Sequence, residues 1–182
     1  LSALGLQEEE VLRWSFEEIP DPAERTTFDF YAELVSGRRV LIEVKLTEAS
    51  FGTAIPDEAH RYKLQGTYVP RLSGKVTPAG LEESAFFLNY QLFRNVSHLD
   101  INRGDRLCLV LPRSNEVTWL QGERFLNYLE APARDAIRMI SVEDLAVALS
   151  AAAPEVSTKL SEHMNLFKTK YMIDGSGKLV AP

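Results

Sequence analysis

The stretch "TTFDFYAELVSGRRVLIEVKLTE", from Thr26 to Glu48, decides how this chain folds. It holds two runs in which apolar residues alternate with others, separated by a Ser-Gly pair. This is the pattern of two antiparallel strands joined by a tight turn. Charged residues interrupt both runs, among them Asp29, Glu43 and Lys45. Because a charge removed from water costs several kcal/mol unless it is paired or bound to a metal, these residues either lie on a solvated face or do chemistry.

The turn between the two strands fixes which residues lie opposite each other. A three-residue loop over 35–37, with Gly37 in the left-handed conformation, puts the apolar sets of both strands on one side of the sheet. It pairs Leu34 with Arg38, and a two-residue turn would point the two sets to opposite sides. The shared apolar face is then made of Phe28, Phe30, Ala32, Leu34, Val40, Ile42, Val44 and Leu46. The register predicts three further pairs: Phe30 with Ile42, Phe28 with Val44, and Asp29 with Glu43.

Two opposed carboxylates on neighbouring strands repel each other, so a positive group is expected between Asp29 and Glu43. A divalent cation with oxygen ligands, Mg2+ or Mn2+, is the natural candidate. Lys45 follows on the same face, where its ammonium group would assist a water molecule. Together these groups suit phosphodiester hydrolysis. The alternative is an exposed strand on which Glu-x-Lys forms only a solvated face.

An Asp in one strand, a Glu-x-Lys in the next, then a helix and a hydrophobic strand resemble the PD-(D/E)XK nuclease superfamily, which has the restriction-endonuclease-like fold. The corresponding pieces are "FDF", "IEVK", a helix at 80–99 and "RLCLVLP". The strings "EVKLTEASFG" and "YQLFRN" also resemble a bacterial subgroup of uncharacterised members. The expected fold is α/β, an αβββαβ core with a mixed sheet flanked by helices. One domain over 1–182 is expected, with a core at 11–112 and a C-terminal extension at 113–182.

The resemblance implies a role for each site residue. Asp29, Glu43 and the Val44 carbonyl would be metal ligands, and Lys45 the catalytic lysine. Members commonly add an acid from the first helix, for which Glu8, Glu9 or Glu10 are candidates, although that helix is short in this sequence. The proline of the superfamily motif is replaced by Phe28, at a position that varies among members.

The predicted helix at 80–99 supplies a second group of candidates. Gln91, Arg94, Asn95 and His98 fall within one stripe beside its apolar face. Relatives place a Gln, Arg or Lys of this helix near the scissile phosphate, so Gln91 is a catalytic candidate, and Arg94 and Asn95 are nucleic-acid-binding candidates. The alternative is the polar flank of an ordinary amphipathic helix.

His60, Arg61 and Lys63 lie in a long segment without a dominant period, where a loop that grips the substrate is expected. They would then also be nucleic-acid-binding residues. The alternative is an exposed helical turn.

Other expectations concern the remaining elements. Strands are predicted at Val11–Ile19, at "DRLCLVLP" and at "AIRMIS". A loose or hairpin-like element is expected at "NEVTWLQ", followed by a short helix. Ser141 and Asp144 predict a capped helix start, and a last helix is expected from about Ser157. Trp14, Trp119, Met139 and Cys108 are interpreted as core residues.

Charge and composition restrict the class of protein. Residues 1–24 hold seven acids and one arginine, whereas the other 158 residues hold 19 of each sign. From His60 to Arg113 there are eight basic residues and four acids, a bias that suits phosphate contacts or an ordinary mixed surface. Apolar runs are too short to span a bilayer, and the single cysteine and three scattered histidines argue against a zinc site. A cytoplasmic protein without a membrane partner is expected.

The sequence therefore predicts a metal-dependent nuclease, an Mg2+-dependent PD-(D/E)XK-type endonuclease whose substrate is nucleic acid, with DNA preferred. The main alternative is a catalytically silent module that keeps the fold and binds nucleic acid or a protein. A third possibility is a nuclease domain that acts within an assembly whose partner supplies specificity. A homodimer would suit cleavage of both strands of a duplex.

Overall fold

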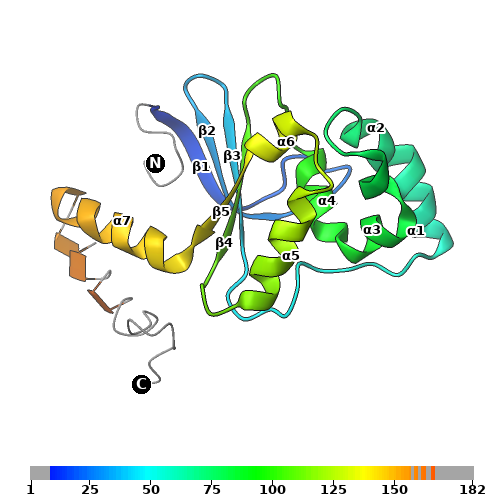
Figure 1. Cartoon of the computed structure of the whole chain (residues 1–182). Helices are drawn as coiled ribbons and strands as arrows, with labels where there is room; N and C mark the ends of the chain where they lie inside the picture. Colours follow the sequence, from blue (N-terminus) through cyan, green and yellow to red (C-terminus); the bar gives the residue numbers. More distant parts are fainter. Residues whose placement is uncertain (1–8, 157, 160, 163–164, 167–182) are drawn as a thin grey trace.

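A five-stranded sheet forms the centre of the molecule (Figure 1). The computed structural model describes residues 9–156, 158–159, 161–162 and 165–166. The sheet has the order β1-β2-β3-β4-β5. Its strands are β1 (Val11–Glu18), β2 (Phe28–Leu34), β3 (Arg39–Val44), β4 (Arg106–Leu111) and β5 (Ile137–Ser141). The first three strands pair antiparallel and the last three parallel, which confirms the predicted mixed sheet.

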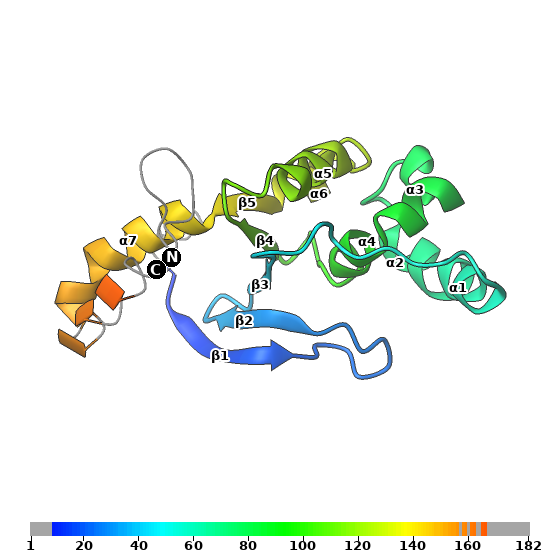
Figure 2. The same cartoon turned by 90° about the horizontal axis from the view of Figure 1, so that it is seen from below.

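Helices cover the sheet unequally on its two sides. The helical elements are α1 (Glu58–Lys63), η2 (Leu64–Tyr68), α2 (Val69–Leu72), η3 (Pro78–Leu81), α3 (Glu83–Leu88), α4 (Tyr90–Ser97), α5 (Glu116–Leu126), α6 (Ala131–Asp135) and α7 (Val142–Val156). Two views at right angles show α1 to α6 gathered on one side and α7 alone on the other (Figures 1 and 2). The larger hydrophobic core therefore lies under α4 and α5, and a smaller one under α7.

The turn between β2 and β3 has the predicted geometry. Gly37 has φ +82°, its N–H donates to the Leu34 carbonyl at 2.8 Å, and the Leu34 N–H donates to the Arg38 carbonyl at 2.9 Å. Phe30 pairs with Ile42, as predicted. Pattern and turn chemistry therefore select this register together.

The ladder between β2 and β3 ends earlier than predicted. Its last pair is Phe30 with Ile42, so the expected direct pairings of Phe28 with Val44 and of Asp29 with Glu43 are wrong. In their place, the Asp29 side chain accepts a hydrogen bond from the Val44 N–H at 2.7 Å. Beyond Phe30 and Ile42 this side-chain contact takes the place of the backbone ladder, while the parallel ladder of β3 with β4 continues as far as Val44.

The face expected to be polar is the more deeply covered one. Tyr31 and Leu41 share it with Glu43 by alternation, and both belong to the larger core. Most of the predicted apolar set faces the smaller core, where Phe30 and Ile42 are only half-buried. Phe28 departs from that set and packs in the larger core. Both faces of the central strands are thus buried, as is usual next to parallel strands.

The single helix predicted at 80–99 is wrong, because it is broken into η3, α3 and α4. The break between α3 and α4 falls at Asn89, with φ −116° and ψ 33°. Its buried side chain donates to the Ala85 carbonyl and accepts from Gln121, so it competes with the helical backbone. Leu88, the last residue of α3 before this break, is exposed.

Further along the chain one expectation fails and another is confirmed. "NEVTWLQ" is the start of α5, capped by the Asn115 side chain, which accepts from the Thr118 N–H. The helix start at Ser141 is confirmed, because its hydroxyl accepts from the Asp144 N–H at 2.9 Å and donates to the Asp144 carboxylate at 2.6 Å. The helices predicted before residue 9 and beyond Ser157 lie largely outside the described residues.

Trp14 is not a core residue, contrary to the sequence interpretation. It is 60% exposed on the edge strand β1, where its ring contacts Phe16 and Phe30. Cys108 is fully buried, as expected. Within the described ranges, no helix is both long enough and apolar enough to cross a membrane.

Substitution of Gly37 tests the turn. A non-glycine residue in the left-handed conformation costs roughly 1–2 kcal/mol, so Gly37→Ala should lower the free energy of unfolding by about that much. Gly66→Ala is the matched control, because Gly66 lies in a helical segment without positive φ and has open space around its Cα. Urea unfolding measures both variants. Equal stability of the two would contradict the turn assignment.

Candidate active site

The candidate site is built around the Glu43 carboxylate, near the end of β3. The residue is only 3% exposed, beneath α4. Its Oε1 accepts from Gln91 Nε2 at 2.6 Å and pairs with Lys45 Nζ at 2.8 Å. Asn95 Nδ2 lies 3.4 Å from Oε2. A buried charge thus has one cation and two amides as partners, the condition under which burial of a charge is tolerated.

The electrostatic balance at Glu43 favours an added positive charge. Burial raises the pKa of the Glu43 carboxyl, and the nearby Asp29 raises it further, while the hydrogen bond and charge of Lys45 offset only part of this effect. Existing partners therefore do not fully compensate the ionised form. A second cation would stabilise it.

Asp29 lies beside Glu43 but in more open surroundings. Its Oδ2 is held by the Val44 N–H, and among the described residues no donor contacts Oδ1. The Lys45 N–H donates to the Val110 carbonyl at 3.0 Å, which fixes the backbone of Lys45 against β4. Glu48 Oε1 is 4.0 Å from Lys45 Nζ, and its Oε2 accepts from the Thr47 N–H, so the contacts of Glu48 are local ones.

The polar stripe of α4 divides between two carboxylates. Gln91 and Asn95, four residues apart, face Glu43. Arg94 and His98, also four residues apart, face a second buried carboxylate, that of Glu24. Asn95 is fully buried and is therefore a partner of Glu43 rather than an exposed residue that meets nucleic acid. Arg94 keeps a quarter of its side chain exposed.

Glu24 was not predicted from the sequence. Its side chain is completely buried and accepts from Thr26, Tyr68, Arg94 Nε (3.1 Å) and His98 Nε2 (3.2 Å). Burial alone would raise its pKa, but the hydrogen bonds from His98, Thr26 and Tyr68 and the charge of Arg94 outweigh burial and lower it. Its position in the connection "AERT", which has no period, offers no sequence signal of burial.

The three candidates of the 58–63 helix do not meet the Glu43 carboxylate. His60 Nδ1 lies 2.8 Å from Asp57, and Arg61 Nε donates to Glu83 at 2.9 Å. Lys63 Nζ lies 3.8 Å from Glu24, and nearly half of its side chain is exposed. The sequence alternative of an exposed helical turn therefore describes this segment, and Lys63 is the member that approaches Glu24, the carboxylate that Arg94 also binds.

Among the described residues, no third acid joins Asp29 and Glu43. Glu9 is bound to Arg38 and to the Ser36 hydroxyl, at the turn end of the hairpin. The Glu10 carbonyl accepts from the Val35 N–H at the same end. Glu8 lies outside the described residues. In the described part of the chain, no group of three or more His, Cys, Asp or Glu side chains is placed to hold a metal.

The available donors nevertheless fit Mg2+ or Mn2+. Asp29 Oδ1, the Glu43 carboxylate and the Val44 carbonyl are oxygen donors, and Mg2+ is typically held by one or two carboxylates with waters and a substrate phosphate. Buried Asn95 Oδ1 has no hydrogen-bond partner among the described residues. An unpaired buried acceptor costs about 1–3 kcal/mol, so the site favours a donor, such as a metal-bound water, at this point.

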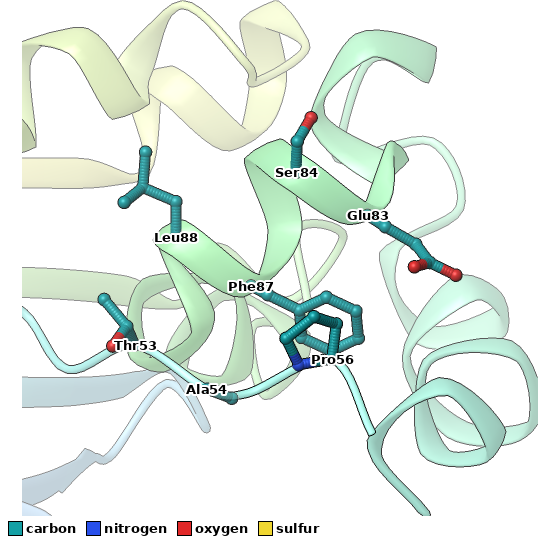
Figure 3. A pocket seen from close by; sticks show the side chains of 7 residues that line it. All are labelled: Thr53, Ala54, Pro56, Glu83, Ser84, Phe87 and Leu88. Carbon is teal, nitrogen blue, oxygen red and sulfur yellow. The ribbon is translucent and has the colours of Figure 1, made fainter. Parts of the chain in front are cut away.

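A surface hollow nearby has different chemistry. It is lined by Thr53, Ala54, Pro56, Glu83, Ser84, Phe87 and Leu88 (Figure 3). The lining is mainly apolar, and its only charged side chain is the acid Glu83. Affinity for a phosphate backbone comes chiefly from cationic side chains, so an apolar hollow whose charged lining residue is an acid is a poor fit for nucleic acid.

The mixed sheet, the strand-borne acids and the helix packed over them define a restriction-endonuclease-like fold. A family model described as "Restriction Endonuclease associating with ARP" matches residues 2–172. The chain therefore belongs to this restriction-endonuclease-like family. No curated protein and no solved structure gives a significant match.

The contacts of Glu24 should make the free energy of unfolding depend on pH. Because the pKa of Glu24 is lowered in the folded protein, its stabilisation is fully present above the unfolded carboxyl pKa of about 4.3 and is lost as the pH falls below it. Glu24→Gln should lower the free energy of unfolding by about 3 kcal/mol at pH 7, and the difference from wild type should shrink below about pH 4.

Urea unfolding at several pH values measures this difference. Glu83→Gln is the control, because its pair with Arg61 is half-exposed and should contribute less than about 1 kcal/mol at any pH. A difference between wild type and Glu24→Gln that stays constant down to pH 3 would contradict the assignment.

Proposed function

We propose that this protein is a metal-dependent nuclease that hydrolyses phosphodiester bonds, with DNA as the substrate. The observation that supports this proposal most strongly is the buried Glu43 carboxylate, with Asp29 beside it and Lys45 Nζ at 2.8 Å. A solvated strand face, the alternative for Glu-x-Lys, would leave Glu43 in water. Its burial under α4 has a cost that a site for chemistry explains.

Asp29, Glu43 and the Val44 carbonyl would hold Mg2+ or Mn2+. When bound, the ion supplies a Lewis acid that stabilises charge on the phosphate and lowers the pKa of a coordinated water. Asp29 Oδ2 is fixed by the Val44 N–H, so Oδ1 is left to bind. The family membership supports this donor set without specifying the ion.

Lys45 and Gln91 would act on the substrate side of Glu43. Lys45 provides N–H donors that hold the attacking water or the scissile phosphate, and its pairing with Glu43 fixes its position. Gln91 donates to Glu43 through Nε2, which orients the carboxylate. Gly52 is close enough to Gln91 that a Cβ added there would lie 3.1 Å from Gln91 Oε1, so the loop after β3 also confines this side chain.

Arg94 and Lys63 are the best-placed nucleic-acid contacts among the candidates. Both approach Glu24 while retaining exposed side-chain surface, and Arg94 belongs to the same helix as Gln91. His60 and Arg61 would contribute at the periphery, since each already has an acidic partner. DNA is preferred because the family description names a restriction endonuclease.

The family description also names an association with ARP. We therefore propose that the chain works within an assembly in which a partner contributes to the choice of substrate, as sequence reasoning allowed. Bacterial origin, a cytoplasmic location and a homodimer are parts of the same hypothesis. The second candidate function is a silent nuclease-fold module that binds nucleic acid or a protein. The acidic segment before residue 25 and the described association favour it.

A cleavage assay tests the nuclease proposal. Plasmid and single-stranded DNA are incubated with Mg2+ or Mn2+, and wild type is compared with Asp29→Asn, Glu43→Gln and Lys45→Ala. Each variant should lose about 100-fold or more in rate, because each removes a group that stabilises charge in the transition state. Glu48→Gln is the matched control. Glu48 is exposed and comes no closer to Lys45 than 4.0 Å, so this variant should retain activity.

Calorimetry with Mn2+ decides between the two candidate functions. The nuclease proposal predicts binding that disappears in Asp29→Asn and Glu43→Gln. Wild-type protein that neither cleaves DNA nor binds the metal would support the silent module. Full activity in Glu43→Gln and Lys45→Ala would exclude this site while leaving the fold unaffected.

A further inference from the structure

The Glu24 carboxylate is a buried charge to which the proposed nuclease chemistry assigns no role. Glu24 receives contacts from the segment before β2 through Thr26, from η2 through Tyr68, and from α4 through Arg94 and His98. The Glu24 side chain is completely buried, although Arg94 keeps a quarter of its own side chain exposed. One carboxylate therefore joins three separate parts of the chain.

Geometry connects Glu24 to the candidate site through α4. Gln91 and Asn95 contact Glu43, and the neighbouring stripe of Arg94 and His98 contacts Glu24. Residues three apart on an α-helix differ by about 60° in direction, so the two stripes are adjacent. A rotation of α4 that released Glu24 would also turn the two amides away from Glu43.

A second connection runs through the chain into β2. Glu24 lies five residues before Asp29, and the His98 ring that bonds Glu24 also makes an edge contact with Phe28 at 5.6 Å between centroids. Phe28 directly precedes Asp29 and is itself fully buried. His98, at the end of α4, thus contacts both Glu24 and the first residue of β2, the strand that carries Asp29.

The buried ion pairs of Glu24 are poorly suited to a role in stability alone. Replacement of a buried ion pair by apolar residues is often neutral or stabilising, so such a pair is a poor device for stability alone. Its hydrogen bonds are directional, however, and they select one orientation of the elements they join. This is the property that a site divided between a strand and a helix requires.

We propose that Glu24 is a positioning residue for the candidate site. Through Arg94 and His98 it holds α4 in the orientation in which the two amides of that helix contact Glu43. Through the segment before β2 it also keeps Asp29 beside the site. The inference rests on the proposed function for its consequence in catalysis. Its structural content, the orientation of the two amides, stands apart from activity.

The test compares Glu24→Gln with Asp105→Asn. Asp105 is a matched control, because it is also a fully buried acid bound to arginines, Arg39 and Arg103, but at the opposite end of β3. Arg39 also donates to the His98 carbonyl, a contact that Asp105→Asn does not remove. In Glu24→Gln, Mn2+ affinity and kcat should each fall about tenfold or more, with KM within about twofold, the size of effect that a residue supporting metal ligands shows. Asp105→Asn should lose stability and keep both values.

A readout without metal or substrate separates this inference from the proposed function. The side-chain amide signals of Gln91 and Asn95 in NMR spectra of metal-free protein should move in Glu24→Gln towards those of free amides, and remain unchanged in Asp105→Asn. His98→Gln, a milder change at a partner of Glu24, should shift them in the same direction and serves if Glu24→Gln does not fold.

Unchanged amide signals in folded Glu24→Gln, or equal changes in Glu24→Gln and Asp105→Asn, would overturn the positioning role. Shifted signals with unaltered kcat and Mn2+ affinity would overturn its catalytic consequence. An inactive wild type that binds no Mn2+, with the amide shifts still present, would overturn the proposed function and leave the orientation by Glu24 supported.

Discussion

Glu43 holds a carboxylate inside the protein, beneath α4, and a charge in that position must be compensated by its surroundings. Lys45 and two amides provide part of this compensation, yet burial still raises the pKa of Glu43. The arrangement of the neighbouring elements follows from this requirement. β3 must end where the ammonium group of Lys45 can reach the Glu43 carboxylate. α4 must present polar residues to that carboxylate in a layer that is otherwise apolar.

α4 meets this requirement because its polar residues serve two buried carboxylates at once. The helix begins only after the break at Asn89, which makes α4 a separate element from α3. Its apolar residues, among them Phe93 and Val96, anchor it in the larger core. Gln91 and Asn95 then reach Glu43 while Arg94 and His98 reach Glu24. Packing fixes the depth of the helix, and hydrogen bonds fix its rotation.

The sequence predicts the parts of this arrangement that depend on local rules. Alternation and the left-handed Gly37 give the register of β2 and β3, and the Ser141 cap gives the start of α7. Tertiary effects lie beyond such rules. The break at Asn89 depends on its contact with Gln121 in α5, and the ladder between β2 and β3 stops at Phe30, beyond which the Asp29 side chain binds the Val44 N–H. Burial of Glu24 depends on side chains from distant segments.

Register and family resemblance together predicted that Asp29, Glu43 and Lys45 lie close to one another. Neither of them predicted the buried carboxylate of Glu24. The central claim is that Asp29 and Glu43 form one metal site. Anomalous scattering from a crystal soaked in Mn2+ tests it most directly. A shared metal site predicts an anomalous peak within ligand distance of both carboxylates, with the Val44 carbonyl beside it. A peak bound elsewhere, with none between Asp29 and Glu43, would contradict it.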